Sequence, residues 1–227
     1  MKNKNIIVVQ NLLRSLPIAV LQDAEVVANL IRVFGIVCWG PPVFGDDEIF
    51  KNRHEDMAGI YQTPIQMAEA LVYLSQFKIE SYCEIGVFQG GNFLFMSEYL
   101  RRFNSDIICT GIDPTDYLNF EIEAIIEKES WLRFYSFTSE VLKKREWDLV
   151  FIDGEHEGGW VVKDWNNVGK YAKICMFHDI QETTCPEPVA LWQKLKQLKG
   201  KIVKEYRKHS AAVPLHGIGI IHREGLL

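Results

Sequence analysis

The chain has 227 residues, of which 48% are hydrophobic and 24% charged, and its formal net charge at pH 7 is −5. A chain of this length can bury one substantial core and a small additional lobe. The negative charge, without a long basic run, argues against nucleic acid as a partner. No apolar stretch reaches the roughly 18 residues of a membrane span, so we expect no membrane insertion. The apolar run at residues 6–9 is followed at once by polar residues, so we expect no export.

The cysteines indicate the redox compartment. They lie at positions 38, 83, 109, 175 and 185 and form no Cys-x-x-Cys pair. Three of them fall in apolar segments that we interpret as strands. We therefore expect reduced core cysteines and a cytoplasmic protein. The sequence leaves open whether the chain forms a homo-oligomer.

Residues 1–75 are interpreted as an N-terminal helical extension. Asp23 precedes a helical apolar stripe that ends at Gly35, and Thr63-Pro64-Ile65-Gln66 has the form of a capping box with proline at the first helical position. The second pattern predicts a helix to about residue 77. Between them, residues 36–62 are rich in aromatic, glycine and proline residues, which fits either a lid over a pocket or a packed connector.

Residues 76–227 alternate apolar segments with amphipathic ones. This alternation predicts an α/β domain with a doubly wound, mostly parallel, seven-stranded sheet. The expected helices lie near 91–103, 119–129, 158–171 and 187–199. The expected strands lie near 79–85, 107–113, 132–137, 148–153, 173–179, 201–206 and 217–222.

The stretch 82–92 carries the most information about a ligand. An apolar run ends at Glu84, a glycine turn follows from Gly86 to Gly90 and Gly91, and a helical pattern begins there. A strand, a tight loop and a helix offer backbone N–H groups to an anionic ligand. A dinucleotide fingerprint needs a second glycine where this chain has Phe88. Glu84 would repel a pyrophosphate but would suit the ammonium group of S-adenosylmethionine.

Further acidic residues follow the other predicted strands. In a doubly wound sheet, ligands bind beyond the carboxyl ends of the strands. Asp113, at the end of the second strand, can accept both hydroxyls of a ribose, a group that nicotinamide dinucleotides and S-adenosylmethionine share. Ser139, after the third strand, is interpreted either as a contact to the adenine or as part of a helix cap.

The fourth and fifth predicted strands end in a group of acids and histidines. Asp153 and Asp179 would meet there and, with His178, could hold Mg²⁺ or another divalent cation, imidazole being better suited to Mn²⁺, Fe or Zn²⁺. Asp153 is also a candidate cofactor-binding residue. The alternative is that Asp153 caps a turn and His178 packs in the core. His156, on the loop after the fourth strand, is a candidate general base for an acceptor hydroxyl.

Taken in order, these motifs resemble the class I S-adenosylmethionine-dependent methyltransferases. The resemblance covers roughly residues 60–222, and the branch that it suggests includes small-molecule and sugar O-methyltransferases and cephalosporin-hydroxylase-like proteins. It implies that Glu84, Gly86 and Asp113 bind the cofactor, that Asp153 and Asp179 lie at a divalent metal position, and that His156 is the base. The motifs that carry it are Glu84-Ile85-Gly86 with Gly90-Gly91-Asn92, Gly111-Ile112-Asp113, Phe151-Ile152-Asp153-Gly154 with His156, Asp164-Trp165, Phe177-His178-Asp179-Ile180 and Gly217-Ile218-Gly219-Ile220.

The chain departs from the family pattern at two points near the site. The run that begins at Asp153 lacks its usual aromatic residue, for which Trp160 is a candidate substitute. Some relatives have two acids where this chain has His178 and Asp179, which bears on the metal rather than on the cofactor. We expect methyl transfer to an oxygen of a small polar acceptor. The alternatives are a non-catalytic binding module of the same fold and a nicotinamide-dependent oxidoreductase.

Overall fold

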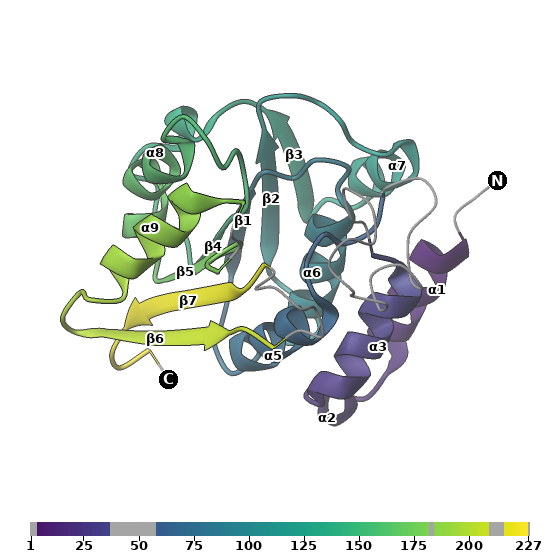
Figure 1. Cartoon of the computed structure of the whole chain (residues 1–227). Helices are drawn as coiled ribbons and strands as arrows, with labels where there is room; N and C mark the ends of the chain where they lie inside the picture. Colours follow the sequence, from purple (N-terminus) through teal and green to yellow (C-terminus); the bar gives the residue numbers. More distant parts are fainter. Residues whose placement is uncertain (1–3, 37–57, 182–183, 209–215, 227) are drawn as a thin grey trace.

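The computed structural model describes residues 4–36, 58–181, 184–208 and 216–226. Seven strands of these residues form one sheet in the order β3-β2-β1-β4-β5-β7-β6 (Figure 1). β3, β2, β1, β4 and β5 run parallel, whereas β7 is antiparallel to both β5 and β6. The predicted doubly wound α/β architecture is confirmed. The strands are β1 (Ser81–Ile85), β2 (Ile108–Asp113), β3 (Leu132–Ser136), β4 (Leu149–Ile152), β5 (Ile174–Phe177), β6 (Lys201–Tyr206) and β7 (Ile218–Arg223).

Helices cover both faces of the sheet. The first face carries α1 (Lys4–Ser15), α3 (Ala24–Phe34), α5 (Pro64–Leu74), α6 (Gly91–Arg101) and α7 (Phe120–Lys128), with the short α2 (Ile18–Leu21) between the first two. The second face carries α8 (Trp160–Asn167) and α9 (Pro186–Leu195), with 3-10 turns at Ser139–Leu142 and Gly169–Tyr171. None of the helices in the described ranges combines the length and apolar character needed to cross a bilayer.

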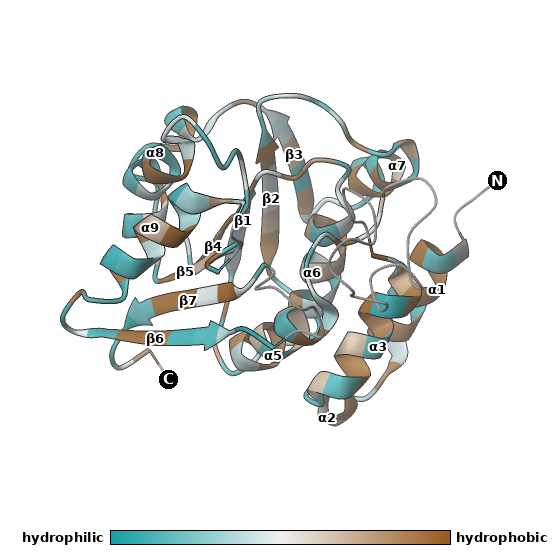
Figure 2. Cartoon of the chain, in the orientation of Figure 1, coloured by the Kyte–Doolittle hydropathy of each residue, from teal (hydrophilic) through white to brown (hydrophobic). Residues whose placement is uncertain are grey.

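Alternation along the strands sorts side chains between two buried clusters. In β1, Tyr82 faces the α6 side and Cys83 the α8 side, and in β4 Phe151 and Ile152 divide in the same way. This period of two places Glu84 on the α6 side. In Figure 2 the strands of the sheet contain brown, hydrophobic segments, whereas α8 and α9 also present teal, hydrophilic ones. The three strand cysteines, Cys83, Cys109 and Cys175, are buried as expected.

The N-terminal extension contains more helix than its sequence predicts. Helices α1 and α2 were not predicted. α1 is held by contacts with α6: Gln10 Nε2 donates to Glu98 Oε1 at 2.8 Å, and Arg14 Nε donates to Glu98 Oε2 at 2.9 Å. Apolar residues of α1, α3 and α5 join the same cluster as β1 and α6. The division at residue 75 stays a prediction.

The expected capping box at the start of α5 is wrong. Proline does occupy the first helical position, but Thr63 makes no side-chain cap hydrogen bond. Its hydroxyl instead lies 3.0 Å from His216 Nδ1, and Gln66 Oε1 accepts from the backbone N–H of Gly217 at 2.9 Å. Both side chains therefore connect the start of α5 to the segment that leads into β7.

Candidate active site

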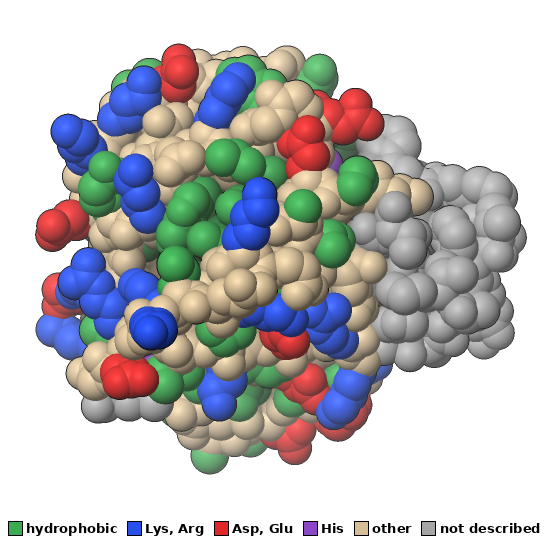
Figure 3. All heavy atoms as spheres, turned by 60° about the vertical axis from the view of Figure 1, so that its left-hand side comes forward, with side chains coloured by type: hydrophobic (Ala, Val, Ile, Leu, Met, Phe, Trp, Pro, Cys, Tyr) green, Lys and Arg blue, Asp and Glu red, His purple; other side chains and the backbone are tan. Residues whose placement is uncertain are grey.

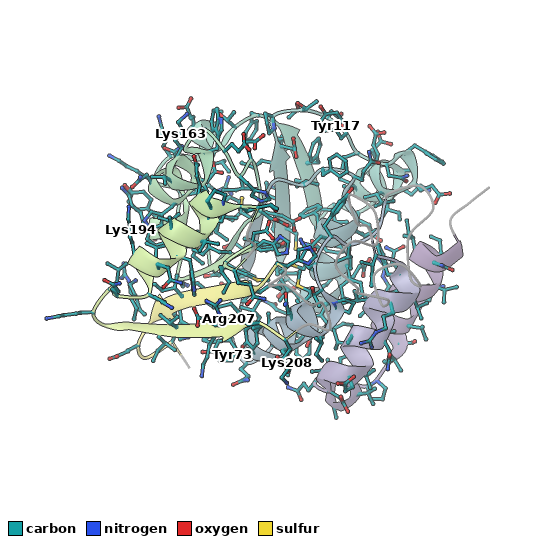
Figure 4. The ribbon with its side chains drawn as sticks, in the orientation of Figure 1. Tyr73, Tyr117, Lys163, Lys194, Arg207 and Lys208 are labelled. Carbon is teal, nitrogen blue, oxygen red and sulfur yellow. The ribbon has the colours of Figure 1, made fainter. Side chains whose placement is uncertain are left out.

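A cavity of about 790 Å³ opens beyond the carboxyl ends of the parallel strands. Its walls come from the glycine turn after β1, the loops after β2, β3, β4 and β5, and the segment before α5. Figure 4 shows Tyr117, a wall residue, in the loop between β2 and α7. The predicted catalytic, cofactor-binding and metal-binding residues all line this one cavity: Glu84, Gly86, Gly90, Gly91, Asp113, Ser139, Asp153, His156, His178 and Asp179.

Glu84 is a buried acid in the wall of the cavity. Glu84 is 1% exposed, and its Oε2 accepts hydrogen bonds from the Tyr82 hydroxyl and, at 3.2 Å, from Asn92 Nδ2. Burial outweighs these two hydrogen bonds and raises the pKa of Glu84 to about 8. A cation placed against this carboxylate would favour its ionised form.

The glycine turn brings the backbone of β1 against the loop after β4. Gly86 has a φ of +91°, and a Cβ added there would lie 2.1 Å from the carbonyl oxygen of Asp153. Gly90 has a φ of +88° and precedes α6, whose first residue is Gly91. A side chain at Gly86 would meet backbone, which has little freedom to move, so glycine is required at this position.

Asp113 ends β2 and connects it to the glycine turn. Its Oδ2 accepts from the backbone N–H of Phe88 and its Oδ1 from that of Thr115, both at 3.0 Å. Because β1 and β2 are parallel neighbours in which Glu84 pairs with Gly111, the acids Glu84 and Asp113 lie at the same end of adjacent strands. This is the arrangement that the strand-end rule predicts.

Ser139 lies in the loop after β3 and is buried against α8. Its hydroxyl oxygen accepts from Asn167 Nδ2 at 3.0 Å. It also hydrogen-bonds Asp164, whose pKa burial raises to about 6. The 3-10 turn at this point begins after Thr138 and shows no side-chain cap hydrogen bond, so the capping alternative for this segment is wrong.

Two histidines and two aspartates form a cluster at the ends of β4 and β5. His178 Nδ1 lies 3.0 Å from Asp153 Oδ1 and 3.2 Å from Asp179 Oδ2. His156 Nε2 lies 3.1 Å from Asp179 Oδ2 and 4.0 Å from Asp153 Oδ1. Asp179, with a φ of +57°, turns back toward both histidines directly after β5.

The cluster is electrostatically coupled. Burial lowers the pKa of His178, but the charges of Asp153 and Asp179 and their hydrogen bonds outweigh it and raise that pKa well above 6.5. Burial raises the pKa of Asp179, whereas the neighbouring His178 lowers it to a net value below that of an ordinary aspartate. Ionised aspartate beside protonated His178 is therefore the favoured state at neutral pH.

The same side chains are the predicted metal ligands. Asp153, His178 and Asp179 each offer one atom within 4.8 Å of the others. An imidazole nitrogen lies between the two carboxylates, in the place where a bridging cation would bind. Mg²⁺ prefers oxygen ligands alone, so this donor set does not fit it, whereas imidazole with carboxylates suits Zn²⁺ or Mn²⁺.

Several cavity residues were not predicted from the sequence. Gln62 Nε2 donates a hydrogen bond to Asp153 Oδ2. Tyr61, Phe88 and Tyr117 form an aromatic row, with ring centroids 5.5 Å and 5.6 Å apart. The aromatic richness of 36–62 was the available signal for Tyr61 as a wall residue; residues 37–57 of that predicted lid lie outside the described part of the chain.

Trp160 and Cys185 also lie in the wall of the cavity. Trp160 lies in the wall, as its candidate role as the missing aromatic requires, and Lys163 Nζ lies 3.7 Å from its ring centroid. Cys185, which precedes α9, also lines the cavity and contacts His156. No motif in the sequence distinguishes Cys185 from the core cysteines.

Comparisons with known structures identify the fold. No family model and no curated protein matches the sequence. A methyltransferase from Podospora anserina, solved with bound S-adenosylhomocysteine, is similar in structure, with a TM-score of 0.54 at 14% identity over 77% of this chain and 84% of that one. The chain has the class I methyltransferase fold. This fold is the one that the resemblance in the sequence implies.

Other structures with this class I methyltransferase fold differ in acceptor. An O-methyltransferase from Bacillus cereus, also with S-adenosylhomocysteine, has a TM-score of 0.53 at 11% identity over 74% of this chain and 84% of that one. An rRNA methylase from Streptococcus thermophilus has a TM-score of 0.52 at 9% identity over 70% and 96%. Because structures of enzymes with different acceptors match about equally well, the likeness establishes the fold and not the acceptor.

Proposed function

We propose that the protein is an S-adenosylmethionine-dependent methyltransferase. The observation that supports this most strongly is that Glu84 and Asp113, on either side of the glycine turn, line one cavity. In the proposed complex the cofactor's ammonium group faces Glu84, its ribose hydroxyls face Asp113, and its adenine lies toward Ser139. The turn at Gly86 to Gly91 supplies backbone contacts beside the helix N-terminus.

The cofactor part of the proposal is tested by calorimetric titration with S-adenosylmethionine and S-adenosylhomocysteine. We expect saturable binding of both, and no binding of NADH in a fluorescence titration. Absence of binding at millimolar S-adenosylmethionine would contradict the proposal, and tight NADH binding would favour the oxidoreductase instead.

Methyl transfer requires alignment and an activated acceptor. The positive charge on sulfur makes loss of the methyl group favourable, and alignment of donor and acceptor contributes several kcal/mol. A hydroxyl acceptor has a pKa far above 7 and needs a base. His156 is the proposed base, and Asp179 Oδ2, 3.1 Å from its Nε2, is the group that orients it.

A small polar acceptor such as a sugar or a secondary metabolite fits this site better than nucleic acid. The cavity volume of about 790 Å³ lies within the range of small-molecule sites. The net charge is −5, and on the face in Figure 3 lysine and arginine side chains are scattered among acidic and hydrophobic ones rather than gathered in a stripe. The buried strand cysteines support a cytoplasmic location.

The role of His156 separates an enzyme from a binding module. His156→Ala should leave S-adenosylhomocysteine affinity near that of the wild type and strongly reduce transfer of labelled methyl groups to a panel of sugar and phenol hydroxyls. Glu157→Gln, an exposed change in the same loop, is the control. Unchanged transfer in His156→Ala would remove this residue from the mechanism. A divalent cation at Asp153, His178 and Asp179 would be of the Zn²⁺ or Mn²⁺ type, and no step of this mechanism depends on it.

A further inference from the structure

A thiol completes a second set of metal-binding groups beside the aspartate–histidine cluster. Cys185 Sγ lies 3.4 Å from His156 Nδ1, and His156 Nε2 lies 3.1 Å from Asp179 Oδ2. Each of the three residues offers one ligand atom within 4.8 Å of the others. They come from the loop after β4, the end of β5 and the start of α9, so the fold gathers them from three separate elements.

The chemistry of this set is that of a zinc site. Thiolate, imidazole and carboxylate are the ligands that Zn²⁺ takes, and three protein ligands with an open fourth position are typical of accessible zinc centres. In a tetrahedral site with ordinary bond lengths, neighbouring ligand atoms are about 3.5 Å apart. The separation between Cys185 Sγ and His156 Nδ1 already matches that spacing.

Two further observations point to a cation. The side chain of Asp179 is only 4% exposed, and among the described residues its Oδ1 has no hydrogen-bond partner. A buried carboxylate oxygen without a partner is costly unless a ligand satisfies it. Cys185 is the N-cap residue of the ten-residue helix α9, where the helix dipole favours negative charge such as that of a thiolate.

We propose that His156, Asp179 and Cys185 bind Zn²⁺ or a similar borderline metal ion at the edge of the cavity. The ion would bind the imidazole nitrogen with which His156 otherwise accepts a proton. A bound ion would therefore prevent His156 from acting as the general base. This consequence rests on the proposed methyl transfer, whereas the metal site itself does not.

Titration of the full-length protein with Co²⁺ tests the site, because cobalt in a zinc site reports its ligands in the absorption spectrum. We expect one Co²⁺ per chain, with visible bands of tetrahedral cobalt and a near-ultraviolet sulfur-to-cobalt charge-transfer band. Zn²⁺ should displace the ion and millimolar Mg²⁺ should not. Cys185→Ser, which retains a good helix N-cap residue, should abolish the charge-transfer band. His156→Ala should weaken binding about tenfold or more, and Glu157→Gln should leave it unchanged.

The outcomes are decisive. A wild-type spectrum without a charge-transfer band, a band that survives in Cys185→Ser with native circular dichroism, or equal displacement by Mg²⁺ would overturn the proposal. Failure of S-adenosylhomocysteine binding together with the expected cobalt spectrum would contradict the methyltransferase function and support the metal site.

Discussion

Replacing Glu84 with glutamine should stabilise the protein without ligand and impair cofactor binding. Burial raises the pKa of Glu84 from 4.5 to about 8, a shift of about 3.5 pH units. At about 1.4 kcal/mol per unit, ionising this group in the folded state costs about 5 kcal/mol. Glutamine keeps the shape of the side chain and an oxygen that accepts from Tyr82 and Asn92, but it carries no charge at any pH.

The sign of the effect follows from proton binding. Between pH 4.5 and about 8, folded Glu84 retains a proton that the unfolded chain has released, so wild-type stability attributable to this group falls as pH rises. The free energy of unfolding of Glu84→Gln should therefore exceed that of the wild type by an amount that grows by about 1.4 kcal/mol per pH unit, and levels off above pH 8.

Urea denaturation of the two proteins without ligand at pH 5, 7 and 8.5 measures this difference. Glu157→Gln, the exposed control, should show no such growth. A gap between Glu84→Gln and wild type that stays constant across these pH values would refute the reasoning, because it would mean that Glu84 ionises normally in the folded state.

Cofactor binding supplies the second half of this prediction. The ammonium group of S-adenosylmethionine should favour ionised Glu84, so binding to the wild type at pH 7 should release a proton, detectable as a dependence of the calorimetric heat on the buffer. Glu84→Gln should lose most of the affinity and the proton release. Equal affinity in the two proteins would mean that the ammonium group binds elsewhere.

Three other changes test the turn, the ribose contact and the N-terminal extension. Gly86→Ala should destabilise the protein by several kcal/mol in thermal unfolding. The control Gly159→Ala has a φ of +74° but no atom within 4 Å of the added Cβ, so it should show only the small backbone cost. Equal losses of stability in the two variants would exclude the clash of Gly86→Ala with the loop after β4. Asp113→Asn should weaken S-adenosylhomocysteine binding about tenfold by calorimetry, and 2′,3′-dideoxy analogues should lose little further affinity in this variant; additive losses would separate Asp113 from the ribose. Arg14→Ala leaves buried Glu98 without its cation and should cost about 1–3 kcal/mol in urea denaturation, most of it recovered in the double variant with Glu98→Gln; a double variant no more stable than the single one would contradict the pairing.

Local patterns were sufficient to predict the sheet and the acidic site residues at the strand ends. Alternating apolar segments gave the strands to within a few residues, and parallel topology alone then carries the acids at strand ends, such as Glu84 and Asp113, to one edge. The same rule brought Asp153 and Asp179 together. These predictions succeed because each depends on a short period or on the direction of a strand.

The features that were missed depend on contacts between distant segments. Helix α1 is held in place by contacts with α6, and the side chains of Thr63 and Gln66 bind residues about 150 positions away rather than capping their own helix. Cys185 meets His156 across 29 positions through the placement of α9. These contacts leave no local pattern in the sequence, because packing, and not spacing along the chain, determines the partner.

A crystal structure of the protein with S-adenosylhomocysteine tests the proposed cofactor site most directly. We expect the ribose hydroxyls within hydrogen-bond distance of the Asp113 carboxylate, the amino group of the ligand facing Glu84, and the sulfur directed toward His156. A ligand bound outside this cavity, or one whose ribose and amino group contact neither carboxylate, would contradict it.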